Sequence, residues 1–226
     1  MIKKLMIGLA PLLGVAAFAV MPALAQAETK AYGTCVNTTE ALEEHPPCPV
    51  GEKTFTAFGN GTPVKVLTEK TYNGGNFILK APSGTIECED LKDSGTVENV
   101  AGVGNSKETL IFTHCSAGGC RVQTAGAGAG VIRTEVTDKV LTETTVEIKV
   151  PAAGIVIVFS GSPGGCPEPG KEVGKVTGSV IGSQAKGSND LVFAAAKGLK
   201  FKGEESELTG NDETYTEATG KPVVIN

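Results

Sequence analysis

Aromatic side chains are scarce in this chain. It has no tryptophan and only three tyrosines, Tyr32, Tyr72 and Tyr215, in 226 residues. Proteins that bind or cleave carbohydrates usually stack sugar rings against tryptophan or tyrosine, whose large flat faces supply much of the contact area. The composition therefore disfavours carbohydrate recognition on an aromatic platform.

Arginine and histidine are too few for two other classes of function. Arg121 and Arg133 are the only arginines and the lysines are scattered, whereas a nucleic-acid site needs clustered cations that displace counterions from phosphates. A serine or cysteine nucleophile needs a histidine base, and His45 and His114 are the only histidines. Because no Gly-x-Ser-x-Gly motif is present either, we expect neither nucleic-acid binding nor triad-type hydrolysis.

The N-terminal segment has the three parts of a secretory signal peptide. Lys3 and Lys4 precede an apolar run over residues 5–24, and the small-residue cleavage site is Ala-Gln-Ala at 25–27. We therefore expect a signal peptide over 1–27, a mature chain that begins at Glu28, and a secreted, extracellular or cell-surface location. Removal of the two lysines changes the net charge from −5 to −7, which disfavours binding to an anionic membrane surface.

No later segment has the length of a membrane-spanning helix. Such a helix needs about 20 predominantly apolar residues, whereas the most apolar later stretch, Ile155–Phe159, has the length of a strand. We expect no membrane span in the mature chain.

Six cysteines lie in the expected mature chain, and a secreted chain with an even number of cysteines usually forms disulfides. The sequence alone does not select one connectivity. The short-range pairings are Cys35 with Cys48, Cys88 with Cys115, and Cys120 with Cys166.

A metal site is the alternative use of these thiols. His114, Cys115 and Cys120 would supply ligands, with His45 as a distant fourth. Structural zinc sites favour short paired spacings such as Cys-x2-Cys, which the chain lacks. We expect no metal and no other cofactor, and interpret His114 as a polar residue beside a disulfide at the end of a strand.

The mature chain has the pattern of many short strands. It is rich in Thr, Val and Gly, and turn residues recur every several positions. The clearest alternation lies over 140–150, where Val140, Val146 and Val150 share one face, and predicts a single strand there. One short helical segment is expected over 38–44. The pattern predicts an all-β fold, an antiparallel β-sandwich or a barrel-like variant of it, stabilised by disulfides and with little or no helix.

The expected mature chain divides into an N-terminal cysteine-containing arm over 28–52 and a β-sandwich domain over 53–226. The alanine–glycine stretch Ala125–Gly130 is expected to be a loop, because its glycines relieve steric limits on the backbone.

Glu87 and Glu89 are the remaining candidates for catalysis. Two residues apart on a strand, their side chains would project from one face about 6 to 7 Å apart. Such a separation suits an inverting glycosidase or a calcium site. The simpler interpretation is favoured: Cys88 faces the core between them, and both acids lie on the solvated face.

Three stretches carry a family resemblance: residues 83–88 (SGTIEC), residues 111–115 (IFTHC) with Cys120 after them, and residues 176–182 (VTGSVIG). They resemble segments of a loosely defined group of uncharacterised secreted bacterial β-proteins, with strands rich in Thr and Gly and a few cysteines. The resemblance implies an extracellular β-sandwich and brings no activity with it.

These observations predict a non-catalytic secreted or cell-surface β-sandwich, a structural or interaction module with an extracellular partner. The alternative is a secreted hydrolase that uses Glu87 and Glu89, or a calcium-assisted site nearby. Convergent acids in a deep pocket would favour the enzyme, and a filled core with flat surfaces would favour the module.

The disulfide hypothesis predicts that no thiol of the secreted protein is alkylated before reduction and that all six are alkylated afterwards. Intact-mass measurement with and without reduction checks this, and the same mass reports whether the chain begins at Glu28. Labelling of two or more thiols without reduction would reopen metal or redox chemistry around Cys115 and Cys120. Peptide mapping that found these two cysteines bonded to each other would contradict the expected pairing.

Overall fold

The computed structural model describes residues 30–35, 55–67, 76–161, 165–185 and 187–225, and these ranges contain no helix. The expected signal peptide and the expected helix over 38–44 lie outside them. The strands are β1 (Tyr32–Cys35), β2 (Phe55–Ala57), β3 (Val64–Leu67), β4 (Phe77–Ala81), β5 (Gly84–Cys88), β6 (Asp90–Val100), β7 (Val103–Thr113), β8 (Ser116–Ala117), β9 (Cys120–Thr124), β10 (Ile132–Thr142), β11 (Thr145–Lys149), β12 (Ile155–Phe159), β13 (Glu172–Gln184), β14 (Asp190–Phe201), β15 (Glu204–Glu213), β16 (Tyr215–Thr216) and β17 (Val223–Ile225). The predicted all-β, disulfide-containing antiparallel fold is confirmed.

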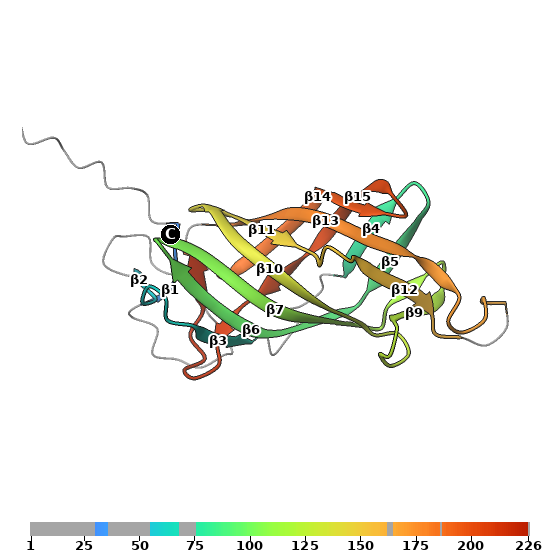
Figure 1. Ribbon diagram of the computed structural model, residues 1–226, viewed down its shortest axis with the longest axis horizontal. Helices are drawn as coiled ribbons and strands as arrows, with labels where there is room; N and C mark the ends of the chain where they lie inside the picture. The colour runs from blue at the N-terminus through green and yellow to red at the C-terminus, as the bar shows by residue number, and fades with distance from the viewer. Residues whose placement is uncertain (1–29, 36–54, 68–75, 162–164, 186, 226) are drawn as a thin grey trace, which may run out of the picture.

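Eight of these strands form a closed barrel. Their order around the ring is β13, β12, β9, β8, β5, β4, β15 and β14, which pairs again with β13. The seam that closes the ring is the antiparallel pairing of β12 with β13, in which Ile155 lies opposite Val176. From β13 the sheet continues outward through β11, β10, β7, β6, β3 and β16. The longest strands run along the elongated molecule (Figure 1).

A second, three-stranded sheet joins the two ends of the described chain. β1 pairs with β2 on one side and with β17 on the other. The side chain of Asn99 fixes β1 to the large sheet: it accepts the Tyr32 N–H at 2.8 Å and donates to the Tyr32 carbonyl at 2.9 Å. Asn99 thus gives the buried Tyr32 N–H a partner and shares the Tyr32 carbonyl with the Phe58 N–H, which donates to it at 3.0 Å.

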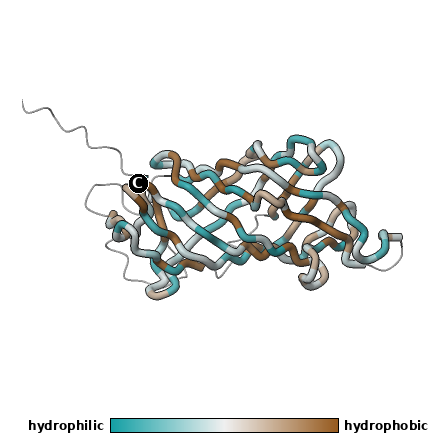
Figure 2. Tube along the Cα trace, in the orientation of Figure 1, coloured by the Kyte–Doolittle hydropathy of each residue, from teal (hydrophilic) through white to brown (hydrophobic). Residues whose placement is uncertain are grey.

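Alternation of side chains along the strands builds the core. In β10 every second residue from Ile132 to Val140 is buried and those between are exposed. Figure 2 shows hydrophobic and hydrophilic positions following one another along the long strands. The buried apolar side chains form a large cluster around Ile157 and Phe201 and a smaller one around Val97 and Ile225. Because successive strand residues point to opposite faces, one face fills the interior and the other meets water.

The predicted single strand over 140–150 is wrong. β10 ends at Thr142 and β11 begins at Thr145, so the segment is a hairpin in which Val140 lies opposite Val146. Both valines are buried, as the alternation predicted. In the turn, the Thr144 N–H donates to the Thr142 hydroxyl at 3.2 Å. The apolar residues before and after the turn face the same side of the sheet. Their spacing therefore resembles that of a single strand and did not show the reversal. The expected loop over Ala125–Gly130 is confirmed as the connection between β9 and β10.

The β6–β7 hairpin generates a stability prediction. Ala101 and Gly102 occupy its two-residue turn with φ of 50° and 76°, the left-handed pair of a type I′ turn. This conformation costs alanine about 1 kcal/mol, whereas asparagine tolerates it. We expect Ala101→Asn to raise the free energy of unfolding in urea by about 0.5 to 1 kcal/mol, and Gly102→Ala to lower it by about 1 kcal/mol. Equal urea midpoints for both variants and the parent would contradict this account of the turn.

Candidate functional site

Two disulfides lie at the end of the barrel where β5, β8 and β9 meet. Cys88 of β5 is bonded to Cys115, and Cys120 of β9 is bonded to Cys166 in the connection between β12 and β13. Both bonds are pairings expected from the sequence, and Cys115 is not bonded to Cys120. Each joins segments that are separated along the chain, by 27 and 46 residues respectively.

The described residues contain no free cysteine. Cys35 is also disulfide-bonded, while Cys48 and His45 lie outside the described ranges. The two cysteines nearest His114 in sequence are oxidised, so neither can act as a thiolate ligand beside it. Over the described part of the chain, no group of three or more His, Cys, Asp or Glu side chains has an arrangement that could hold a metal ion.

A cleft of about 470 Å³, which we call the end cleft, opens at the disulfide-bonded end of the barrel. The turns between β4 and β5, β8 and β9, and β14 and β15 surround it. Its lining residues are Ser83, Gly84, Thr85, Glu87, Ser116, Ala117, Gly118, Gly119, Phe159, Val173, Phe201 and Lys202. Buried apolar side chains therefore form its floor, and hydroxyls, one carboxylate and one ammonium group surround them.

The β8–β9 turn is a rim of the end cleft that is held at both ends. Gly118 and Gly119 have φ of 58° and 81°, which glycine adopts without a steric cost. Immediately before this hairpin, Cys115 is bonded to β5, and at the start of β9, Cys120 is bonded to the β12–β13 connection. The two disulfides therefore restrict the position of this rim relative to the barrel.

The structure separates the two candidate catalytic acids. Glu87 and Glu89 are both exposed and Cys88 between them is buried, as the alternation predicted. Of the two, Glu87 lines the end cleft and Glu89 does not. Glu89 lies beside His114 instead, with 3.7 Å between Glu89 Oε2 and His114 Nδ1. The two carboxylates do not face a common cavity.

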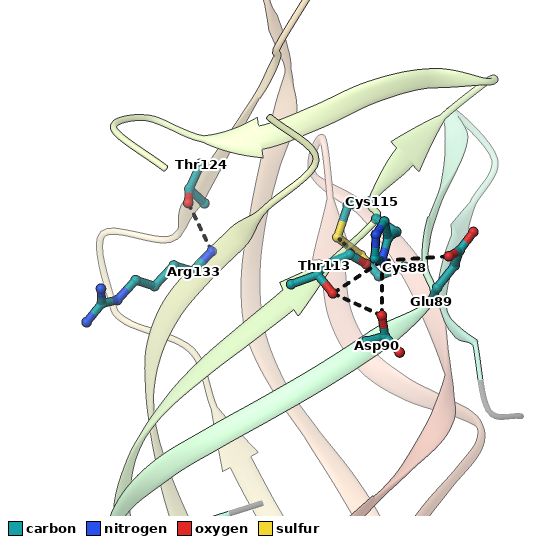
Figure 3. Close-up of a disulfide and its surroundings, with 8 residues drawn as sticks. Cys88, Glu89, Asp90, Thr113, Cys115, Thr124 and Arg133 are labelled. Atoms are coloured by element: carbon teal, nitrogen blue, oxygen red, sulfur yellow. Dashed lines mark hydrogen bonds and ion pairs between the residues drawn. A yellow bond between two sulfur atoms is a disulfide. The ribbon is translucent and has the colours of Figure 1, made fainter. Parts of the chain in front are cut away.

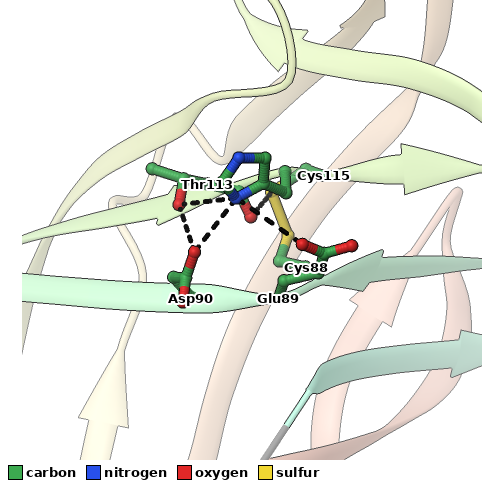
Figure 4. A network of polar contacts seen from close by, with 6 residues as sticks. Cys88, Glu89, Asp90, Thr113 and Cys115 are labelled. Atoms are coloured by element: carbon green, nitrogen blue, oxygen red, sulfur yellow. Dashed lines mark hydrogen bonds and ion pairs between the residues drawn. A yellow bond between two sulfur atoms is a disulfide. The ribbon is translucent and has the colours of Figure 1, made fainter. Parts of the chain in front are cut away.

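A small polar network lies beside the Cys88–Cys115 disulfide, and Figure 3 labels its members Glu89, Asp90 and Thr113. The His114 ring contacts all three. His114 Nδ1 lies 3.0 Å from Asp90 Oδ2, and the Thr113 hydroxyl donates to the same oxygen at 3.2 Å (Figure 4). The His114 side chain is 67% exposed, and ion pairs this open to solvent contribute little to stability. His114 is thus a polar residue beside a disulfide at the end of β7, as expected.

A cluster of acids inside the molecule was missed from the sequence. Asp93 of β6, Glu108 of β7 and Asp138 of β10 are all more than nine-tenths buried. Glu108 and Asp138 line a polar cavity of about 30 Å³ together with the partly buried Asp212 of β15. We call these four residues the interior acid cluster. The cavity also touches Val97 and other members of the smaller apolar cluster, so the acids lie where the two cores meet.

Strand pairing and a glycine make room for this cluster. Glu108 lies opposite Gly95 of β6 and Val136 of β10. A Cβ at Gly95 would come within 2.7 Å of the Glu108 Cγ and 2.3 Å of the Lys107 carbonyl oxygen. The signal in the sequence was an acid at an inward position of an alternating strand, such as Asp138 between two buried valines, but alternation alone does not show that such acids converge.

Burial governs the protonation of the cluster. It raises the pKa of Glu108 well above its usual value, and the charges of Asp138, Asp93 and Asp212 raise it further, while the nearby Ser106 hydroxyl opposes the shift. Burial likewise raises the pKa of Asp138 to about 6, although hydrogen bonds from Ser106 and Glu108 oppose the shift. Ser106 Oγ donates to Asp138 Oδ2 at 2.7 Å, whereas Asp138 Oδ1 has no hydrogen-bond partner among the described residues.

The interior acid cluster also affects the pKa of the buried Tyr32 side chain. Burial raises the pKa of Tyr32 well above its usual value, and the charges of Asp138 and Glu108 add to the shift. Tyr32 therefore stays protonated beside the acids, and no described basic side chain is buried among them.

The described residues include no helix that is long and apolar enough to cross a membrane. Comparison with family models, with curated proteins and with solved structures finds no match to this chain.

The raised pKa of Asp138 predicts a pH-dependent stability. The folded chain holds this proton more tightly than the unfolded chain, whose aspartates titrate near pH 4, so stability falls as the pH rises from about 4 through about 6. Asp138→Asn keeps an acceptor for Ser106 and removes the charge. We expect its free energy of unfolding to exceed that of the parent by roughly 2 to 3 kcal/mol at pH 8, and the difference to vanish near pH 4.

Urea unfolding at several pH values measures this difference. Glu87→Gln is the matched control, because it removes an exposed carboxylate and should change the pH profile little. If the free energy of unfolding of Asp138→Asn differed from that of the parent by the same amount at every pH, the titration of the buried acid would be contradicted.

Proposed function

We propose that the chain is a secreted or cell-surface, non-catalytic interaction module that binds its partner in the end cleft. The observation that carries this proposal is the disulfide-bonded rim. A binding loop that is already held in position loses less conformational entropy when it binds, which increases affinity. Two disulfides at the two ends of one short hairpin have this effect on the rim of the end cleft.

The lining of the end cleft indicates the chemistry of the partner. Its volume of about 470 Å³ suits a small molecule or a short peptide segment. Glu87 can pair with a cationic group and Lys202 with an anionic one, while Phe159 and Val173 supply apolar contact. The Lys202 ammonium lies 5.3 Å from the centre of the Phe201 ring, a cation–π contact that favours a position over the floor of the cleft. A short peptide segment with both polar and apolar side chains fits this combination.

The arrangement of acids supports the absence of catalysis. Glycoside hydrolysis needs two carboxylates on opposite sides of one bond, and Glu87 is the only acid that lines the end cleft within the described residues. The interior acid cluster does converge, but around a cavity of about 30 Å³, which has room for about one water molecule and not for a substrate. Hydrolysis through Glu87 and Glu89 remains the alternative that the experiment below tests.

Selection from a displayed library of short random peptides tests the proposal. We expect Glu87→Gln and Lys202→Ala each to weaken binding of the selected peptides about tenfold, the effect of losing one charged hydrogen bond. Two matched controls lie outside the cleft: Glu89→Gln, just after β5 and two residues from Glu87, and Lys200→Ala in β14, two residues before Lys202.

Equal losses in the cleft variants and the controls would overturn the end cleft as the binding site. The non-catalytic assignment is tested separately with chromogenic glycosides and esters. Hydrolysis by the parent that is lost in both Glu87→Gln and Glu89→Gln would establish the hydrolase instead.

A further inference from the structure

The interior of the barrel contains a second cavity, separate from the end cleft. Its volume is about 110 Å³, and its walls come from strands of the closed ring together with β6, β7, β10 and β11. Of the side chains that line it, only Thr134 and Asp212 carry oxygen atoms, and Asp212 is also a member of the interior acid cluster. The remaining walls are aliphatic and aromatic, apart from the bonded Cys88.

The surrounding structure prevents this cavity from collapsing. The lining strands of the ring are joined by its continuous pairing, which the β12–β13 seam completes, and the lining strands outside the ring belong to the same sheet, which continues from β13 through β11, β10, β7 and β6. Cys88 is fixed by its disulfide to Cys115. Strand pairing limits how far the backbone of these walls can move inward, so part of the space persists and lowers the stability of the empty protein in proportion to its volume.

Water is a poor occupant of this space. A buried water needs two to four polar partners, and an apolar cavity of similar size stays dry and accepts benzene or xenon. A charged molecule would lose its hydration without gaining a partner along the apolar walls. Phe77 and Phe112 meet at the wall edge to face, with ring centres 5.2 Å apart and planes at 71°, an arrangement that a third ring can extend.

We propose that this cavity is a binding site for a small uncharged apolar molecule of about the size of benzene, with an aromatic ring as the preferred shape. The site is independent of the end cleft, because the two share no lining residue.

Benzene and xenon are the probes, applied to the full mature chain. At a benzene concentration ten times the dissociation constant, we expect the melting temperature to rise by about 3 to 6 °C. We also expect a slowly exchanging bound signal in ¹²⁹Xe NMR. Val180→Phe places a larger side chain in the cavity and should abolish both responses. Its matched control is Ile181→Phe, the next residue of β13, which is 48% exposed and points away from the cavity.

A second variant covers the case in which Val180→Phe does not fold. Leu199→Ala enlarges the cavity from another strand, β14, and should bind p-xylene at least tenfold more tightly than the parent does. The proposal is overturned if the parent shows neither the thermal shift nor the xenon signal, if Val180→Phe folds and retains them, or if Leu199→Ala leaves the affinity for p-xylene unchanged.

Discussion

The pairing of β12 with β13 is the constraint on which the rest of the molecule depends. Without it, β12 would lose one of its two strand neighbours and the ring would open between β12 and β13, which would expose its apolar inner face to water. With it, eight strands close into a ring, and the inward side chains of every strand share one interior. The ring also determines the width of that interior, which in an eight-stranded barrel is either filled by side chains or holds one small ligand.

The same closure explains how the chain tolerates buried acids. Asp93, Glu108 and Asp138 point inward because they occupy inward positions of paired strands. Burial and the charges of neighbouring carboxylates raise the pKa values of Glu108 and Asp138, because several carboxylates that share a low-dielectric space cannot all ionise. The polar cavity lies where the two apolar cores meet, and the protonation of Asp138 links the stability of this region to pH.

The barrel end and the barrel interior differ in the chemistry they offer. At the end, glycine turns and two disulfides hold charged and hydroxyl side chains around an open cleft. Inside, aliphatic and aromatic side chains line a space with almost no hydrogen-bonding groups. The protein therefore has a polar site at its surface and an apolar site in its interior. Substitutions of residues whose side chains lie on opposite sides of a strand distinguish the two sites.

Much of this architecture follows from local patterns. Alternation and turn residues indicated an all-β fold, short spacing indicated two observed disulfides, and the position of Cys88 indicated that Glu87 and Glu89 face solvent. These features depend on neighbours in sequence or on the period of a strand. The reversal at Thr144, the ring seam and the interior acid cluster depend instead on which strands pair and in which register. Register brings Gly95 beside Glu108 and Val176 beside Ile155, and no local pattern specifies those contacts because the energies that select them arise between distant segments.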